Sequence, residues 1–287
     1  MESPYAALSH CWGAKQLFTT TTSTLHLRKT NLNWDSIPAT FQDAIRVTRG
    51  LSIRYLWIDS LCIIQDDIAD WESESSKMGA IYQGAQIVIA ASASPDAEVS
   101  FLAPRQTPYA KPLELQYKCQ NGGVSIVKAR PLLMEFPSIE PLDTRAWAFQ
   151  EQWLSRRLLR YCSGELRWRC RKKESCECQT FHLTAGHRYE SFQGCPSPES
   201  TAWHYLVNWY SMVRVYSLRK LTRKSDKLPA ISGMAAIVSE RISSPYVVGL
   251  WKDTLLFDLQ WETFPSMSKE QHRLLRASRT YLAPTFS

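Results

Sequence analysis

Side chains able to do chemistry gather where an apolar run ends, in the stretch "RYLWIDSLCIIQDD" at residues 54–67. The acid Asp59, the thiol Cys62 and the amide Gln65 follow that run closely. Open α/β sheets bind ligands at the carboxyl ends of their strands. We therefore expect Asp59 and Gln65 to contribute to a binding site, although Asp59 could instead cap the following turn.

Cys62 could be a nucleophile only if a neighbouring base lowered its pKa, and His10 is the nearest candidate in the predicted fold. The preferred interpretation is that Cys62 is a small buried apolar side chain. Ser9 and Trp12 end the first apolar run, where Ser9 could donate to a ligand and Trp12 could stack on a base or pack in the core. Neither G-x-G-x-x-G nor a P-loop is present, so no known phosphate cradle is expected.

The elements that must position these side chains alternate between strand and helix. Strands are predicted at 5–12, 54–59, 86–92 and 164–170, helices at 36–50, 70–85, 143–159, 201–217 and 226–242, and a β-rich insertion or long loop at 95–142. The strand at 86–92 is apolar throughout, as expected for a strand covered on both faces. This alternation predicts an α/β fold whose central sheet is parallel.

Composition limits the class of protein. The chain has 287 residues, of which 44% are hydrophobic and 21% charged, as in globular proteins. It has no membrane-length apolar segment and no secretory signal, which predicts a cytoplasmic protein with no membrane partner. The net charge of +7 comes partly from basic runs at 154–173 and 214–227. Neither run matches a nucleic-acid-binding motif, so nucleic acid is not the expected partner, and a solvated basic face or an anionic small molecule is favoured.

The eight cysteines do not suggest a disulfide framework, because no secretory signal accompanies them. Cys162, Cys170, Cys176 and Cys178 are close in sequence, but their spacing is not that of a zinc knuckle. We expect neither a disulfide nor a metal site among them.

Four segments, "YAALSHCWG", "LWIDSLCIIQDD", "MGAIYQGAQIVIAAS" and "RAWAFQEQWLSRRLL", resemble the fungal heterokaryon incompatibility (HET) domain in order and spacing. Two later segments, "YSLRKLTRKSDKLPAISGMA" and "YVVGLWKDTLLFDLQW", resemble the region that commonly follows that domain. The resemblance implies a HET domain at 5–155 and a mixed, mainly helical HET-associated region at 156–287. From the resemblance we expect this region to be truncated and the chain to lack the segment that usually precedes the first strand.

The resemblance implies a role in programmed cell death after fungal non-self recognition, a form of innate immunity. HET domains are regarded as remote relatives of Toll/interleukin-receptor (TIR) domains, which have a flavodoxin-like parallel sheet. Some TIR domains cleave NAD at the nicotinamide–ribose bond with a glutamate that follows a tryptophan. In "WAFQE", Glu151 follows Trp147 in this way. The analogy makes Glu151 the catalytic candidate and NAD the candidate substrate, with no cofactor expected. The candidate substrate-binding residues are Ser9, Trp12, Asp59, Gln65 and Trp147.

Cleavage of the nicotinamide–ribose bond needs a carboxylate that stabilises oxocarbenium-like charge or holds the ribose hydroxyls. The alternative for Glu151 is a surface ion pair with Arg145, Arg156 or Arg157, worth only about 0–1 kcal/mol. Three functions therefore stay open: an enzymatic cell-death effector, a non-enzymatic signalling module that oligomerises, and a HET-type fold recruited to specialised metabolism. Self-association and other incompatibility or NLR-type proteins are the expected partners.

Overall fold

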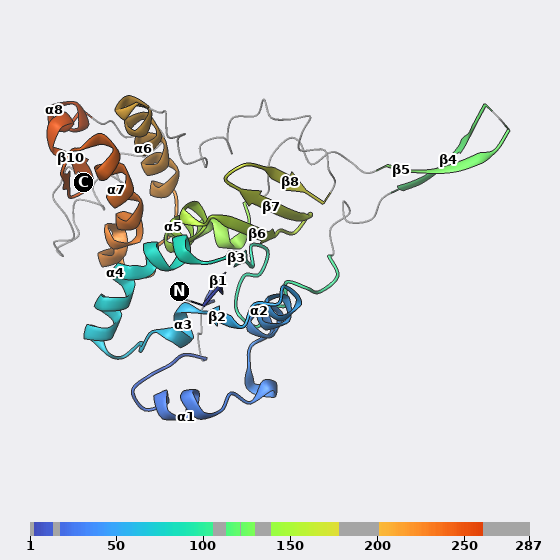
Figure 1. Ribbon diagram of the computed structural model, residues 1–287, viewed down its shortest axis with the longest axis horizontal. Helices are drawn as coiled ribbons and strands as arrows, with labels where there is room; N and C mark the ends of the chain where they lie inside the picture. The colour runs from blue at the N-terminus through green and yellow to red at the C-terminus, as the bar shows by residue number, and fades with distance from the viewer. Residues whose placement is uncertain are drawn as a thin grey trace, which may run out of the picture.

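The structure is a computed structural model that describes residues 3–13, 18–105, 113–120, 122–129, 139–177 and 201–260. Among these residues, six strands form a central sheet in the order β2-β1-β3-β6-β7-β8 (Figure 1). Their bounds are β1 (Tyr5–Ser9), β2 (Tyr55–Trp57), β3 (Ile87–Ala90), β6 (Arg157–Tyr161), β7 (Leu166–Cys170) and β8 (Glu174–Cys176). β2, β1, β3 and β6 are mutually parallel, whereas β7 and β8 continue the sheet antiparallel. The predicted α/β fold, with parallel strands near 5–12, 54–59 and 86–92, is confirmed.

Strand β1 lies between β2 and β3, so the chain builds the sheet outward on both sides of its first strand. Tyr5 pairs with Tyr55 on one side, and Ala6 pairs with Ile87 on the other. The reversal of strand order at β1 creates a topological switch point, where connections on the two sides leave in opposite directions. The carboxyl end of β1 is therefore where this topology favours a site.

Helices cover both faces of the sheet. α2 (Ala39–Gly50) covers one face, where it packs in a core that includes Leu8 of β1. α4 (Ile68–Gly84) covers the other face, where its Tyr82 packs in a core with Ala7. Successive residues of a strand point to opposite faces, so β1 and β3 are buried on both sides, as the continuous apolar run at 86–92 predicts.

α5 (Ala146–Leu154) packs on the same face of the sheet as α4, and two C-terminal helices pack against this pair from outside. α5, α6 (Ala202–Ser217) and α7 (Pro229–Ile242) share an apolar core, and α7 also crosses α4 closely. At that crossing a Cβ added to Gly79 would lie 3.1 Å from the Cα of Gly233. Gln150 of α5 accepts a hydrogen bond from the Gly233 amide at 2.8 Å. α5 is thus fixed against both the sheet core and the C-terminal helices.

The helix predicted at 143–159 is wrong beyond Leu154. Ser155 has an extended backbone and ends α5, and residues 157–161 form β6. Leucine and arginine favour a helix locally, but β6 gains backbone hydrogen bonds to β3 and buries Leu158 completely. The domain boundary expected near residue 155 stays a prediction, and β6, β7 and β8 on its far side belong to the same sheet.

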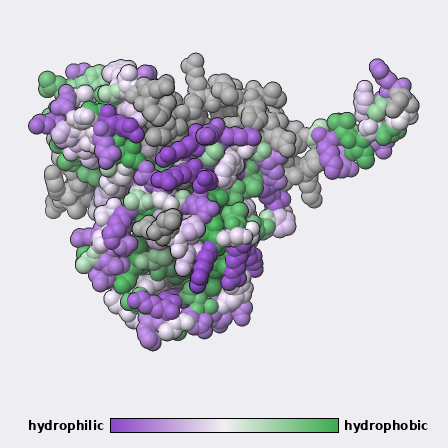
Figure 2. Space-filling model, viewed as in Figure 1, coloured by the Kyte–Doolittle hydropathy of each residue, from purple (hydrophilic) through white to green (hydrophobic). Residues whose placement is uncertain are grey.

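The insertion contains a β-hairpin that projects from the body of the molecule (Figure 1). It consists of β4 (Leu113–Lys118) and β5 (Val124–Ala129), paired antiparallel. This confirms the predicted β-containing insertion within 95–142. Figure 2 shows apolar side chains along this hairpin, most of which are exposed.

The remaining elements are short. They are α1 (Leu25–Thr30), α3 (Asp59–Cys62), α8 (Leu255–Asp258), β9 (Tyr246–Val247) and β10 (Leu250–Trp251). Within the described ranges, no helix is long and apolar enough to cross a membrane. Cys162, Cys170 and Cys176 are free thiols, and Cys178, which was considered with them, lies outside the described residues.

Candidate functional site

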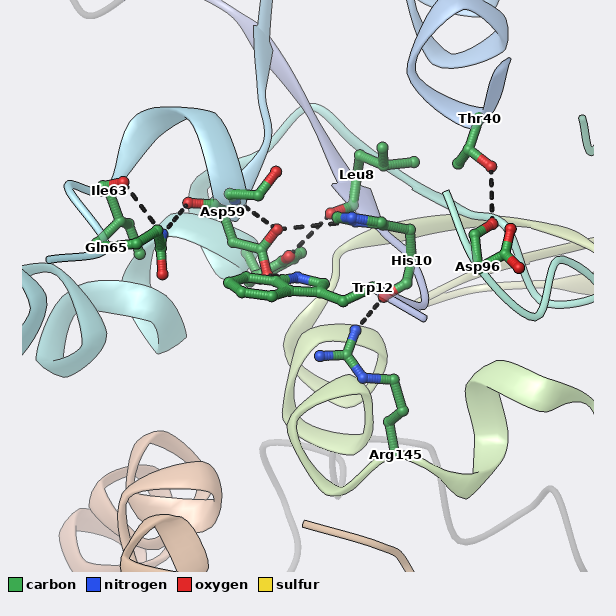
Figure 3. Close-up of polar contacts among 11 residues, drawn as sticks. Leu8, His10, Trp12, Thr40, Asp59, Ile63, Gln65, Asp96 and Arg145 are labelled. Carbon is green, nitrogen blue, oxygen red and sulfur yellow. Dashed lines mark hydrogen bonds and ion pairs between the residues drawn. The ribbon is translucent and has the colours of Figure 1, made fainter. Parts of the chain in front are cut away.

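Asp59 occupies the centre of the switch point, immediately after β2 and at the start of α3. Its Oδ2 accepts a hydrogen bond from the indole Nε1 of Trp12 at 2.8 Å (Figure 3). Its Oδ1 accepts from the Ser60 amide at 2.8 Å and lies 3.7 Å from Nδ1 of His10. Because β1 and β2 are parallel and in register, the residues that follow them meet here. The carboxylate therefore binds the loop after β1 through Trp12 and the Ser60 amide of α3, but it does not make the side-chain cap hydrogen bond of that helix. A role of Asp59 in ligand binding stays a prediction.

Ser9, the last residue of β1, and His10, which follows it, point to opposite faces of the sheet. Ser9 follows Ala7 toward the α4 and α5 face, and His10 follows Leu8 toward the α2 face. His10 is 1% exposed, and its ring meets the Phe41 ring edge-on with the centroids 4.9 Å apart. The pKa of His10 is lowered to about 4, chiefly by burial; the Asp59 charge opposes this lowering and the Arg145 charge adds to it. His10 is therefore a neutral imidazole at neutral pH.

Several polar side chains at this edge lack a hydrogen-bond partner of standard geometry among the described residues. They are the hydroxyls of Ser60 and Ser94 and both ring nitrogens of His10, all buried. These residues follow the ends of β1, β2 and β3. Buried polar groups in native proteins almost always have partners. Their concentration at the carboxyl edge of the sheet is the pattern expected where a ligand or ordered water binds.

Glu151 reaches the same edge from α5. It is 2% exposed, and its helix packs on the face of the sheet toward which Ser9 points. Burial raises the pKa of Glu151 to about 7, and the charge of Asp59 contributes to this rise. The Arg145 charge and the hydroxyls of Ser9 and Tyr82 oppose it by favouring the charged form. Glu151 thus changes its protonation state near neutral pH, as a general acid or base must.

The surface ion pair considered for Glu151 is wrong. Glu151 is buried, whereas Arg156 and Arg157 are exposed, and no described arginine lies within ion-pairing distance of its carboxylate. Arg145 instead donates from its guanidinium to the main-chain carbonyl of His10 (Figure 3). Its charge therefore acts on Glu151 without forming a pair.

Tyr82 and Arg145 belong to the site, although the sequence did not single them out for it. The Tyr82 hydroxyl donates to the carbonyl of Leu8 at 2.9 Å and lies against Glu151. It fixes the end of β1 to α4, and Arg145 fixes the next residues of the chain to the start of α5. The signal for Tyr82 was its place on the inner face of a predicted helix, which is equally typical of a core residue.

Gln65 and Trp147 are held differently from the other candidates. Gln65 donates to the main-chain carbonyls of Asp59 and Ile63, at 3.2 and 3.1 Å (Figure 3). It therefore braces the turn that presents Asp59. The indole of Trp147 donates to Asp226 at 3.1 Å and so ties α5 to the segment before α7.

Cys62 is exposed at the end of α3, and the expectation that it is buried is wrong. The structure brings four of the predicted candidates to one edge of the sheet: Ser9, Trp12, Asp59 and Glu151.

The loop after β3 lies against the loop after β1 at this edge of the sheet. Gly13 has φ +79°, and a Cβ there would lie only 2.5 Å from the Cβ of Asp96. The Thr40 hydroxyl donates to the carbonyl of Asp96 at 3.3 Å (Figure 3). It also donates to the carbonyl of Val99 at 2.7 Å, and the two bonds tie this loop to α2. Only glycine combines this backbone conformation with this close approach, so the position of Trp12 depends on Gly13.

Comparison with protein families identifies the class to which this fold and this site belong. Residues 5–151 match the family model described as "Heterokaryon incompatibility protein (HET)". The matched span covers more than half of the chain and includes the six candidate residues, so the chain belongs to the HET family. No curated protein and no solved structure gave a significant match.

Proposed function

We propose that this HET-domain protein is a cell-death effector that hydrolyses NAD at the nicotinamide–ribose bond, with Glu151 as the catalytic carboxylate. One observation carries the proposal. Glu151 is a buried acid at the switch-point edge, where burial and the charge of Asp59 raise its pKa to about 7. A strongly perturbed acid at such an edge is a candidate for a functional site.

The chemistry fits the two carboxylates. Water replaces nicotinamide on the ribose carbon, and the products are ADP-ribose, nicotinamide and a proton. Nicotinamide leaves as a neutral ring, so the leaving group needs no acid. Positive charge grows on the ribose ring instead, and a carboxylate such as Glu151 stabilises it and accepts the proton of the attacking water.

Asp59 supplies a second negative charge at a fixed position, since Trp12 and the Ser60 amide hold its oxygens. His10 is neutral and adds no opposing positive charge there.

The test is NAD loss and nicotinamide release by the purified chain, measured by chromatography. Glu151→Gln keeps the shape of the side chain but removes the carboxylate, and we expect it to lower the rate by about a hundredfold or more. Glu72→Gln is the matched control, because Glu72 is an exposed acid on α4. Its rate should equal that of the parent. Equal rates for the parent and Glu151→Gln, with both proteins folded, would reject the catalytic role.

A second candidate function, assembly with a second copy of this chain, is favoured by the β4–β5 hairpin. Leu115 lies opposite Val127, and Leu113 and Tyr117 lie on the same face of the hairpin. These four side chains are exposed, and an isolated two-stranded hairpin is only marginally stable in water. Light scattering after size-exclusion chromatography tests this function. A parent that is larger than a monomer and a monomeric Leu115→Glu variant support it, and a monomeric parent contradicts it.

A further inference from the structure

Two arginines next to the candidate site form no ion pair with any described acid. Arg145 and Arg219 are both partly buried, and within the described part of the chain neither forms an ion pair with a carboxylate. Arg160, on neighbouring β6, shows the usual arrangement: its guanidinium donates to both oxygens of Asp143, at 2.9 and 2.8 Å. Such pairing offsets the cost of removing a charge from water.

The fold holds Arg219 in place without using its charge. Residues 219 and 220 lie against the start of α5, where Ala146 donates to the Lys220 carbonyl at 2.9 Å and Lys220 donates to the Thr144 carbonyl at 2.6 Å. Arg219 itself donates to the carbonyl of Arg145 at 3.2 Å, and its guanidinium carbon lies 4.6 Å from the centre of the Phe149 ring. A guanidinium has five N–H donors, and this single bond leaves most of them for another acceptor.

Burial of this cation has an energetic cost that no described residue offsets directly. Burial lowers the pKa of Arg219 to about 10, and the charges of Asp143 and Glu151 only partly counteract it. An anion bound between the arginines would offset that cost. Phosphate groups suit arginine best, because the planar fork of the guanidinium matches two phosphate oxygens.

The sequence already pointed to an excess of positive charge in this region. The basic run at 214–227 matches no nucleic-acid-binding motif, and the structure brings its middle, Arg219 and Lys220, to the start of α5. Arg145 is the residue immediately before α5 and contacts the loop after β1. The basic run and the carboxyl edge of the sheet therefore meet.

We propose that Arg145 and Arg219 form a subsite for the phosphate groups of the ligand, with Lys220 at its rim. The subsite rests on the proposed function only for the identity of the ligand. If the ligand is NAD, the phosphate groups are the diphosphate attached to the ribose whose bond is cleaved. The charges of Arg145 and Glu151 act on each other, as do those of Glu151 and Arg219. A diphosphate joined to the ribose through a single methylene carbon needs this proximity.

Binding of inorganic pyrophosphate and of ADP-ribose to the full chain, measured by titration calorimetry, tests the subsite without any turnover. Arg219→Met removes the charge but keeps an apolar chain against Phe149, and it should weaken both ligands by about tenfold or more. Arg241→Met is the matched control, since Arg241 is also an arginine near an aromatic ring, 5.9 Å from the centre of Tyr205 on α6. Its affinities should equal those of the parent.

The outcomes separate the subsite from the proposed chemistry. Equal weakening by Arg219→Met and Arg241→Met, or no saturable binding to the folded parent, overturns the subsite. If only Arg219→Met weakens ligand binding and the parent releases no nicotinamide, the subsite is supported and the proposed NAD hydrolysis is rejected. Nicotinamide release with the same KM in the parent and Arg219→Met supports the hydrolysis and overturns the subsite. Arg145→Met should act like Arg219→Met, and if it fails to fold because the His10 carbonyl loses its donor, Arg219→Met alone decides.

Discussion

The raised pKa of Glu151 makes the stability of the protein depend on pH in a way that one substitution should remove. The pKa is about 7 in the folded protein, against an ordinary value of 4.5. Between these values the folded protein binds a proton that the unfolded chain has lost, so this group favours folding less as pH rises. A difference of about 2.5 pH units, at about 1.4 kcal/mol per unit, gives about 3 kcal/mol of unfolding free energy.

Glu151→Gln mimics the protonated acid and no longer titrates. Relative to the parent, the variant should therefore gain about 3 kcal/mol of unfolding free energy when pH rises from about 4.5 to about 8, because only the parent loses stability through Glu151 over that range. Urea denaturation followed by tryptophan fluorescence at both pH values measures this change. Glu72→Gln is the control, and its difference from the parent should be small at both pH values because Glu72 is exposed.

A difference between Glu151→Gln and the parent that stays constant with pH would refute the reasoning. It would mean that Glu151 titrates near its ordinary value, so that water or structural relaxation compensates the burial seen here. A difference of the opposite sign would mean that Glu151 is stabilised in its charged form, as in an ion pair.

Three further predictions concern neighbouring residues. His10 has its pKa lowered to about 4, so it adds stability above about pH 6.5 that is lost as pH falls toward 4; His10→Asn should reduce this acid loss of stability, measured as the shift of Tm between pH 7 and about pH 4.5. A Cβ at Gly233 would lie 2.8 Å from a side-chain oxygen of α5, so Gly233→Ala should lower the unfolding free energy by about 1–3 kcal/mol. In Gly50→Ala the added Cβ meets no atom within 4 Å, so the unfolding free energy should be unchanged or slightly raised. Equal effects of the two substitutions in urea denaturation would contradict the packing argument. Trp12→Phe removes the hydrogen bond to the Asp59 carboxylate and should cost about 1–3 kcal/mol in the same assay, and a cost near zero would mean that water replaces the indole.

The sequence predicts the parallel centre of the fold because its strands are distinctive. The run at 86–92 is apolar without interruption and becomes β3, buried throughout. The segment that becomes β6 has no such signal, because its leucines and arginines suit a helix as well as a strand. Pairing with β3 decides its structure, and a pairing between distant parts of the chain is not visible in local sequence.

The candidate residues also differ in whether local sequence predicts their place or only a contact between distant parts of the chain decides it. Ser9 ends a strand, and Trp12 and Asp59 follow strand ends, so the rule for parallel sheets brings them to one edge. Arg145 reaches the carbonyl of His10 across 135 positions of the chain, a contact that no local pattern encodes. Trp147 was expected at the site through its spacing from Glu151, but the spacing does not say that its indole meets Asp226 of the C-terminal region.

The pH dependence of nicotinamide release from NAD tests the central claim most directly, because it links the chemistry to the titration of Glu151. If the Glu151 carboxylate is the catalytic form, the rate of the parent should rise with pH through an inflection near 7, and Glu151→Gln should release little nicotinamide at any pH. A folded parent that releases none, or a Glu151→Gln variant that keeps both the rate and the inflection, would contradict the claim.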